Sequence, residues 1–366
     1  MSETKGYDGA GEPMQVVAVA GAHPPHYYSQ DELVAAFLRH WGEAHHNTAR
    51  LEQLHRAVAV GGRHLALPIE DYANLRGFGD SNDAFIRVGT EIGEQAVSKA
   101  LDDSGLQPRD IDAIFAVSVT GIATPSIDAR LVNRLQMRQN VKRVPIFGLG
   151  CVAGAAGLSR MYDYLKAWPD HVAVLLSVEL CSLTIQRDDF SIPNLISSGL
   201  FGDGAAAVVA VGAERAPRWP TGGPTVLATQ SQFYYDTERT MGWDISDSGF
   251  KVVLSSSVPD VVKQHLGGDI DRFLQSQGLT RAHIGSWVCH PGGPKVLQAF
   301  ESALRVTEED LALTWRSLKE VGNMSSASVL FVLRDTLAER RPAAGTLGLI
   351  LAMGPGFCSE LVLVRW

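Results

Sequence analysis

Short apolar runs alternate with longer amphipathic stretches along the chain, a pattern typical of a layered α/β protein. Residues 14–23 predict the first strand of a core sheet. Residues 30–55 predict helices with one polar face, beginning at Asp31 as the N-cap. Residues 63–72 predict a proline-bounded loop or edge strand. A strong amphipathic pattern over residues 83–104 predicts a helix that the following glycine ends.

An internal repeat organises the rest of the chain. The segment GLQPRDIDAIFAVSVTG (105–121) reappears as GLTRAHIGSWVCHPGG (278–293), and each copy follows an amphipathic helix. Two further pairs keep the same order at an offset of about 170 residues. They are the helices that begin near Cys151 and Asn323, and the apolar strands 171–180 and 346–355. This indicates a duplicated β-α-β unit.

The repeat predicts two related halves, residues 14–220 and 221–366, behind a flexible N-terminus, residues 1–13. Two fused β-α-β halves predict a layered α/β sandwich whose central helices lie between two sheets. Those helices must be apolar on all sides, and the two small-residue helices of the repeat fit that need. The ends of equivalent strands then meet near the pseudo-twofold axis.

Composition narrows the class of protein. The chain is 45% apolar and 20% charged, which is ordinary for a globular enzyme. Its net charge of −8 makes nucleic acid a poor partner. The four cysteines stand singly, so neither a zinc ribbon nor a disulfide scaffold is indicated, and a reducing compartment fits best.

The sequence also argues against a membrane span, a secretion signal and a metal centre. No apolar run approaches the roughly 18–20 residues that a span requires, and the acidic N-terminus lacks the features of a signal peptide. We therefore expect a cytoplasmic protein. Four histidines gather at positions 40, 45, 46 and 55, but no carboxylate or cysteine completes a ligand set, so a solvated helical face is the preferred interpretation.

Cys151 lies where the apolar run VPIFGL ends and a helix rich in glycine and alanine begins. At such a corner the unpaired N–H groups of the first turn and the helix dipole favour a thiolate, which suits a nucleophile. The alternative is that Cys151 is a small buried hydrophobic residue, the commoner role of a free cysteine.

His290 and Asn323 occupy comparable corners. His290 follows the strand IGSWVC and precedes the stiff turn PGGP, which favours a functional role. Asn323 lies between Gly322 and the helix MSSASVLFVL, where it could equally be an ordinary N-cap. A thiol, an imidazole and an amide that converge suit acyl transfer through a thioester, because the two N–H donors could polarise a carbonyl as it becomes an enolate.

Five motifs in this order resemble the type III polyketide synthases, the chalcone-synthase-like branch of the thiolase fold. They are FGLGCVAGAAGL around Cys151, LFGDGAAAVV (200–209), HPGGPKVL at His290, GNMSSASVLFVL at Asn323 and the terminal MGPGFCSELVLVRW. The resemblance runs from about residue 14 to the C-terminus. It implies a homodimeric enzyme with an αβαβα sandwich that loads an acyl-CoA starter on Cys151, extends it with malonyl-CoA and needs no other cofactor or metal.

The resemblance also assigns residues around the catalytic set. Phe201 matches an aromatic gatekeeper between the CoA tunnel and the cavity, whereas the second gatekeeper position holds Val252. Thr184 and Ser325 match cavity-lining positions, and Trp243 could fill the cavity or form its wall. The remaining implied contacts are those with CoA, for which Arg56, Arg63 and Lys295 are the candidates.

The loop SVTGIATPSIDARL (118–131) is similar to the bacterial branch, particularly its alkylpyrone and alkylresorcinol synthases. Because valine at position 252 opens volume, we expect a fatty acyl starter, two or three malonyl extensions and release of a pyrone or resorcinol. The alternatives are a tetrahydroxynaphthalene-type synthase that uses malonyl-CoA alone, and a β-ketoacyl synthase III. A hydrolase, a binding subunit without activity and an HMG-CoA synthase fit less well, the last because no glutamate is expected near the cysteine.

Overall fold

The computed structural model describes residues 14–41, 48–220 and 222–366. The predicted flexible N-terminus lies outside these residues. Cys151, Cys181, Cys289 and Cys358 are all free thiols. Among the described helices, none combines the length and the apolar character that crossing a bilayer would take.

The first half of the chain runs from the first strand to the end of the GDGAAA strand. Its elements are β1 (Met14–Ala22), β2 (His26–Ser29), α1 (Gln30–Trp41), α2 (Thr48–Ala57), β3 (Gly62–Leu65), α3 (Phe78–Ser104), β4 (Ala113–Ser118), α4 (Ile127–Arg134), β5 (Lys142–Phe147), α5 (Ala153–Ala167), β6 (Val172–Leu180), α6 (Ile192–Leu200) and β7 (Asp203–Gly212). The helix predicted from residue 83 therefore begins one turn earlier, at Phe78.

The second half supplies the remaining elements. They are β8 (Thr225–Phe233), β9 (Met241–Ser246), β10 (Gly249–Leu254), α7 (Val258–Ser276), β11 (Ile284–Cys289), α8 (Pro294–Leu304), α9 (Ala312–Val321), α10 (Ser328–Glu339), β12 (Leu347–Gly354) and β13 (Cys358–Arg365). Each strand and helix of the predicted repeat is present.

The strand order repeats between the halves, which confirms the internal duplication. In the first half β4 runs parallel to β6, and the order continues with β7 and β1 in antiparallel ladders. In the second half β11 runs parallel to β12, followed by β13 and β8 in antiparallel ladders. Strand β5 extends the first group beyond β4.

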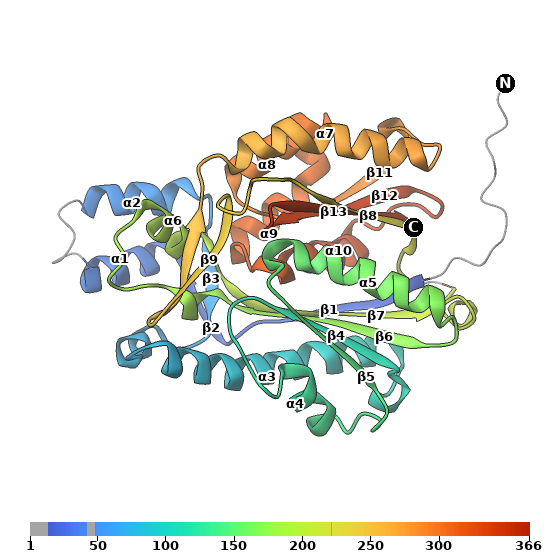
Figure 1. The fold of residues 1–366 in the computed structure, drawn as a ribbon, viewed down its shortest axis with the longest axis horizontal. Helices are drawn as coiled ribbons and strands as arrows, with labels where there is room; N and C mark the ends of the chain where they lie inside the picture. The colour runs from blue at the N-terminus through green and yellow to red at the C-terminus, as the bar shows by residue number, and fades with distance from the viewer. Residues whose placement is uncertain (1–13, 42–47, 221) are drawn as a thin grey trace.

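Five layers result, as the sequence predicted. Helices α5 and α10 lie between the two groups of strands, with α3 and α4 outside one group and α7 and α8 outside the other (Figure 1). Three buried apolar clusters fill the spaces between these layers. The central cluster holds much of α5 and α10, so these helices are apolar on both sides.

One feature of the sheets was not predicted. Residues Met14 and Gln15 of β1 pair with Val226 and Thr225 of β8, so the two groups form one continuous sheet of nine strands. The two halves are therefore joined by backbone hydrogen bonds as well as by the helices between them.

Two local expectations were wrong. Asp31 is not the N-cap of α1, because Ser29 takes that role: its hydroxyl accepts from the Glu32 N–H (3.3 Å), and its own N–H donates to the Glu32 carboxylate (2.8 Å). This reciprocal pair is a capping box. Of the four histidines at positions 40, 45, 46 and 55, only His55 has a described side chain. It is fully buried and bonded to the Ser198 hydroxyl (3.0 Å), so it does not lie on a solvated face.

Candidate active site

Cys151 lies in a 3-10 turn (Gly150–Val152) between β5 and α5, the strand-to-helix corner that the sequence predicted. The turn needs glycine at position 150, whose φ is +55°. A Cβ there would also lie 2.7 Å from the Pro355 ring. The Gly354–Pro355–Gly356 segment therefore presses directly on the turn that carries the thiol.

The head of α10 meets the head of α5 at this corner. The Cys151 thiol lies 3.7 Å from the Ser325 hydroxyl, to which it donates. A Cβ on Gly154 would lie only 2.2 Å from the Ser326 carbonyl oxygen, so the two helix heads touch through their backbones. The small residues after Cys151 thus bring the two halves of the site together.

Asn323 makes a capping-type contact through its side-chain oxygen, while its amide nitrogen is directed at another segment of the site. Its Oδ1 accepts from the Ser325 N–H (2.8 Å), as a capping side chain does. This bond fixes the amide plane and leaves Nδ2 with one long contact, to the Gly292 carbonyl (3.4 Å). Gly292 belongs to the turn that follows His290, so the three predicted residues are connected through Ser325 and this turn.

His290 follows the last residue of β11 and is held by its backbone N–H, which donates to the Leu351 carbonyl (2.9 Å). Its ring is 2% exposed, and no described residue hydrogen-bonds to either ring nitrogen. Burial lowers the pKa of His290 to about 3. The imidazole is therefore neutral at pH 7, and both of its nitrogens are available to a ligand.

The thiolate expected from the helix start is not favoured in the resting protein. Burial raises the pKa of the Cys151 thiol to about 12, and this outweighs the hydrogen bonds from Ser325 and Asn323, which lower it. The expectation considered the N–H groups of the first turn but not the loss of water around the sulfur. The resting site holds a neutral thiol and a neutral imidazole.

Phe201, the predicted gatekeeper, lies beside Asn323. The two residues form an isolated parallel bridge between α6 and the head of α10. The Asn323 N–H donates to the Leu200 carbonyl, and the Asn323 carbonyl accepts from the Gly202 N–H, both at 3.0 Å. Any displacement of the backbone around Phe201 therefore acts on the backbone of Asn323.

The hairpin formed by β9 and β10 places Trp243 directly opposite Val252. Residues opposed in an antiparallel ladder project to the same face, with Cβ atoms about 5 Å apart. Phe250 projects to that face too, and its ring centroid lies 6.0 Å from the Trp243 indole. The valine that was expected to open volume therefore has an indole as its cross-strand neighbour.

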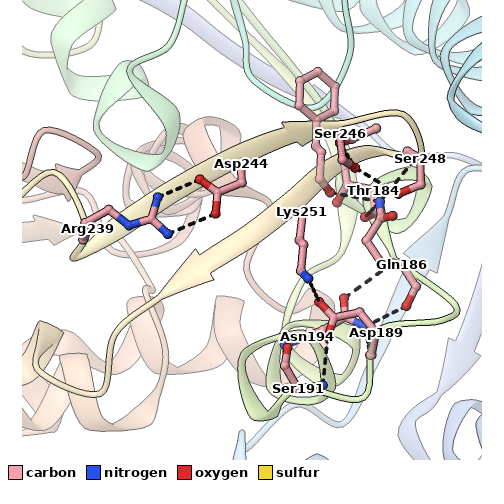
Figure 2. Close-up of polar contacts among 12 residues, drawn as sticks. Thr184, Gln186, Asp189, Ser191, Asn194, Arg239, Asp244, Ser246, Ser248 and Lys251 are labelled. Carbon is pink, nitrogen blue, oxygen red and sulfur yellow. Dashed lines mark hydrogen bonds and ion pairs between the residues drawn. The ribbon is translucent and has the colours of Figure 1, made fainter.

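The hairpin is fastened to the loop that leads into α6 (Figure 2). Gln186 Nε2 donates to three backbone carbonyls, those of Thr184 (3.1 Å), Ser248 (3.4 Å) and Phe250 (3.1 Å). Lys251 Nζ forms an ion pair with Asp189 (3.5 Å). These contacts fix the distance between Thr184 and the strand that carries Val252.

Thr184 itself is buried, and its hydroxyl donates to the Cys181 carbonyl (2.8 Å). A cavity of about 780 Å³ lies next to this segment. Leu183, Ile185 and Lys251 line it, but Thr184, Val252 and Cys151 do not. The cavity therefore lies beside the predicted route from Cys151 past Thr184 and does not continue it.

The three candidate CoA contacts have different surroundings. Arg63 is 1% exposed, and its guanidinium donates to the carbonyls of Ser198 and Gly199 and to the side chain of Gln30. It is held by buried groups and also lines the 780 Å³ cavity, so its contact with a phosphate stays a prediction. Arg56 is exposed on α2 and pairs with Glu52 and Asp31. Lys295 is exposed in the first turn of α8.

Glu179 is a residue of the site that the sequence reasoning missed. It is fully buried on β6 and accepts hydrogen bonds from the Val119 N–H (3.1 Å), the Thr120 hydroxyl (2.8 Å) and the Ser326 hydroxyl. Its charge is one of the influences that raise the pKa of Cys151. A glutamate does therefore lie near the cysteine. The signal was a single charged residue in the apolar run HVAVLLSVEL.

Comparison with known families covers nearly the whole chain. The N-terminal domain of chalcone and stilbene synthases matches residues 2–215, and the C-terminal domain matches residues 225–366. The chain is 54% identical over 351 residues to the 1,3,6,8-tetrahydroxynaphthalene synthase of Streptomyces peucetius subsp. caesius, covering 96% of this chain and 93% of that protein.

Two further relatives extend the comparison. The chain is 36% identical to a putative chalcone synthase of Bacillus subtilis (strain 168), covering 96% of this chain and 99% of that protein. Its fold superposes on the crystal structure of the 1,3,6,8-tetrahydroxynaphthalene synthase from Streptomyces coelicolor A3(2), a bacterial type III polyketide synthase, with a TM-score of 0.90 and 30% sequence identity. That match covers 96% of this chain and 99% of the other.

Proposed function

The chain belongs to the chalcone and stilbene synthase family and is a type III polyketide synthase, and from this premise we propose that it uses malonyl-CoA alone and releases a tetrahydroxynaphthalene. Malonyl-CoA then serves as both starter and extender, and no added cofactor takes part. The relatives named as 1,3,6,8-tetrahydroxynaphthalene synthases support this alternative over the fatty acyl starter.

The proposed reaction begins with the neutral Cys151 thiol and the neutral His290 imidazole. As substrate enters, the Cys151 thiol gives its proton to His290, and the sulfur attacks the thioester carbonyl of the starter. CoA leaves as the thiol, taking that proton back from His290. The starter is then held on Cys151 as a thioester.

An extender malonyl-CoA next loses CO2, and the electron pair of the broken carbon–carbon bond forms an enolate. The N–H groups of His290 and of Asn323 Nδ2 stabilise the enolate oxygen. The enolate carbon attacks the Cys151 thioester, and the carbon–sulfur bond breaks with its electron pair on the Cys151 sulfur. The extended chain, now a CoA thioester, is transferred back to this thiolate with release of CoA before the next extension. The fixed amide plane of Asn323 supports this role, because its donor needs no reorientation.

The observation that carries the choice of starter is the indole of Trp243 opposite Val252. A fatty starter needs an open apolar tunnel past position 252, whereas a malonyl starter needs only a short, wide cavity. The half-buried indole occupies the face of the hairpin on which that tunnel would have to open. This favours the smallest starter.

The test is to offer malonyl-CoA alone, and then with acyl-CoAs of graded length, to wild type and to Trp243→Ala. We expect tetrahydroxynaphthalene from malonyl-CoA alone with wild type, and alkylpyrones from medium-chain starters only with the variant. Tyr235→Ala removes another aromatic ring, one that is 86% exposed, and should change neither result. Products built only from fatty starters by wild type would overturn the proposal, and a single condensation would indicate a β-ketoacyl synthase III.

We also propose that the protein is a cytoplasmic homodimer, as the resemblance implies. Strand β5 supports the dimer: it ends the strand order of the sheet, and no described strand pairs with its outer edge. Four of its six residues are exposed, and among them Phe147 is 56% exposed. Light scattering on the purified protein should give twice the chain mass, and Phe147→Glu, which places a charge on this edge, should reduce it to a monomer.

A further inference from the structure

The C-terminal end of α6 lies next to the active site, and each carbonyl of its last turn has a partner. The last four carbonyls of a helix find no donor inside the helix. In α6 they belong to residues 197–200, of which the first accepts from the Phe201 N–H and the last from the Asn323 N–H, both at 3.0 Å. The Arg63 guanidinium donates to the two between them, at 2.7 Å in the case of Gly199. Arg63 and Asn323 therefore hold the end of the same helix.

Arg63 also touches the chain just beyond α6. An added Cβ on Gly202 would lie 3.1 Å from the Arg63 Cβ and 2.4 Å from the Val321 carbonyl oxygen. The Gly202 N–H donates to the Asn323 carbonyl (3.0 Å). The backbone at Gly202 is thus in close contact both with Arg63 and with the segment that leads to Asn323. Close packing of this kind transmits a displacement from one side to the other.

The position of Arg63 is itself fixed. It is 1% exposed, and its guanidinium also donates to the Gln30 Oε1 (2.6 Å). Gln30 Nε2 in turn donates to the Gly199 carbonyl (3.1 Å). Burial lowers the pKa of Arg63 to about 10, so the guanidinium still carries its charge at pH 7. The negative end of the α6 dipole favours a cation at this place. The result is a rigid, charged pair of donors at the end of α6.

The proposed chemistry uses the side-chain amide of Asn323, whose place depends on its backbone. Its Oδ1 accepts from the Ser325 N–H, so the amide plane is fixed. Its backbone N–H and carbonyl are both bonded to the segment 200–202. The other two catalytic residues have different supports, because His290 is bonded to β12 and Cys151 lies in the turn before α5. A shift of the end of α6 therefore reaches Asn323 first.

We propose that Arg63 is a positioning residue for the decarboxylation step. By holding the end of α6 it sets the backbone of Asn323, and with it the place where Asn323 Nδ2 meets the enolate oxygen. Loss of Arg63 should therefore slow the release of CO2 and leave the loading of Cys151 intact. This inference rests on the proposed role of Asn323 in stabilising the enolate.

The experiment follows the two steps separately with malonyl-CoA, in wild type and Arg63→Ala. Loading is read as the acyl adduct on Cys151 by rapid quenching and intact-protein mass spectrometry, and decarboxylation as CO2 released from labelled substrate. The variant should release CO2 roughly tenfold to a hundredfold more slowly, because an error of about 1 Å in a catalytic group has effects of that size. KM for malonyl-CoA and the rate of loading should not change. A loss of folded protein would instead reduce both steps by one factor.

Arg281→Ala is the matched control. The Arg281 guanidinium also donates to helix carbonyls, those of Ala303 near the end of α8 and of Gly267 on α7 (2.6 Å). Both helices belong to an outer layer of the fold (Figure 1). This variant should lose stability for the same physical reason as Arg63→Ala, yet load Cys151 and release CO2 at the wild-type rates.

If Arg63→Ala does not fold, Gln30→Met takes its place, because it removes one donor to the Gly199 carbonyl and the acceptor that fixes Arg63. Its release of CO2 should fall roughly threefold, the effect of one weak hydrogen bond. The proposal is overturned if loading falls as much as CO2 release, if CO2 release stays at the wild-type rate, or if KM alone rises, as loss of a phosphate contact would cause. A wild type that releases no CO2 from malonyl-CoA would overturn the proposed function as well, so the two failures can be told apart.

Discussion

Replacing Gly154 with alanine tests whether the touching helix heads set the geometry of the site. The new methyl group would lie 2.2 Å from the Ser326 carbonyl oxygen and 2.6 Å from a methyl group of Val329. The carbonyl belongs to the backbone and cannot rotate away. Either α5 or the head of α10 must therefore shift by roughly an ångström, since packed interiors leave no free space.

The cost follows from that shift. Overpacking of this kind destabilises a protein by about 1–3 kcal/mol. The displaced turn carries Ser325 and Ser326, and Asn323 is bonded to it. A misplacement of about 1 Å in a catalytic group can lower turnover about a hundredfold. We therefore expect turnover to fall by a larger factor than stability alone would explain.

The assay compares the free energy of unfolding in urea and the turnover of malonyl-CoA for wild type, Gly154→Ala and Gly79→Ala. Gly79 lies in the first turn of α3 with no atom within 4 Å of its added Cβ, so its replacement should be neutral or slightly stabilising. If Gly154→Ala keeps wild-type turnover, the two helix heads do not set the positions of the catalytic groups, and the reasoning fails.

Three more outcomes are expected. Cys151→Ala should abolish the covalent acyl adduct in intact-protein mass spectra while leaving the circular dichroism spectrum unchanged; a persistent adduct would exclude Cys151 as the nucleophile. Arg63→Ala should lower the free energy of unfolding by roughly 2 kcal/mol or more, because it leaves buried carbonyls unpaired, and should leave KM for malonyl-CoA unchanged. Arg56→Ala should raise KM for malonyl-CoA and leave the free energy of unfolding unchanged. His55 is buried, and burial lowers its pKa to about 3. As the pH falls below 6.5, the unfolded chain takes up a proton at His55 but the folded chain does not, so the free energy of unfolding decreases. His55→Gln should therefore lose less unfolding free energy than wild type between pH 7 and pH 5, and equal losses in urea titrations would contradict this.

The internal repeat made the architecture predictable. Matched segments fixed which strands are neighbours, and the order of β4, β6 and β7 recurs in β11, β12 and β13. Because equivalent corners had to meet, the repeat also brought together the segments that carry Cys151, His290 and Asn323. The join of β1 to β8 involves only two residue pairs and leaves no periodic signal in the sequence.

The chemistry of the site was harder to predict because it depends on burial. A helix start alone suggests a thiolate, but desolvation of Cys151 reverses that preference. Arg63 was expected at the surface, as most arginines are, yet buried carbonyls surround its guanidinium. Glu179 was overlooked because a lone carboxylate in an apolar strand identifies no partner until the fold supplies one.

The width of the substrate region could not be predicted because it depends on the register between β9 and β10. Val252 alone suggested an open tunnel, and the sequence left open whether Trp243 fills the cavity or forms its wall. A shift of one residue would have turned the indole to the opposite face of the hairpin. Only the observed ladder places Trp243 against Val252.

The pairing of β1 with β7 and β8 has a consequence for synthesis on the ribosome. Met14 pairs with Gly212 and with Val226, so the first strand made must wait for partners about 200 residues later. At about 5–20 residues per second, that wait lasts roughly 10–40 seconds. Strands β4, β5 and β6 can pair with one another during this wait. The edge of β6 that later pairs with β7 stays uncovered until β7 emerges. A chaperone that shields nascent chains should therefore bind this protein longest between the synthesis of β1 and that of its partners β7 and β8. Ribosome profiling of chaperone-bound chains can measure this.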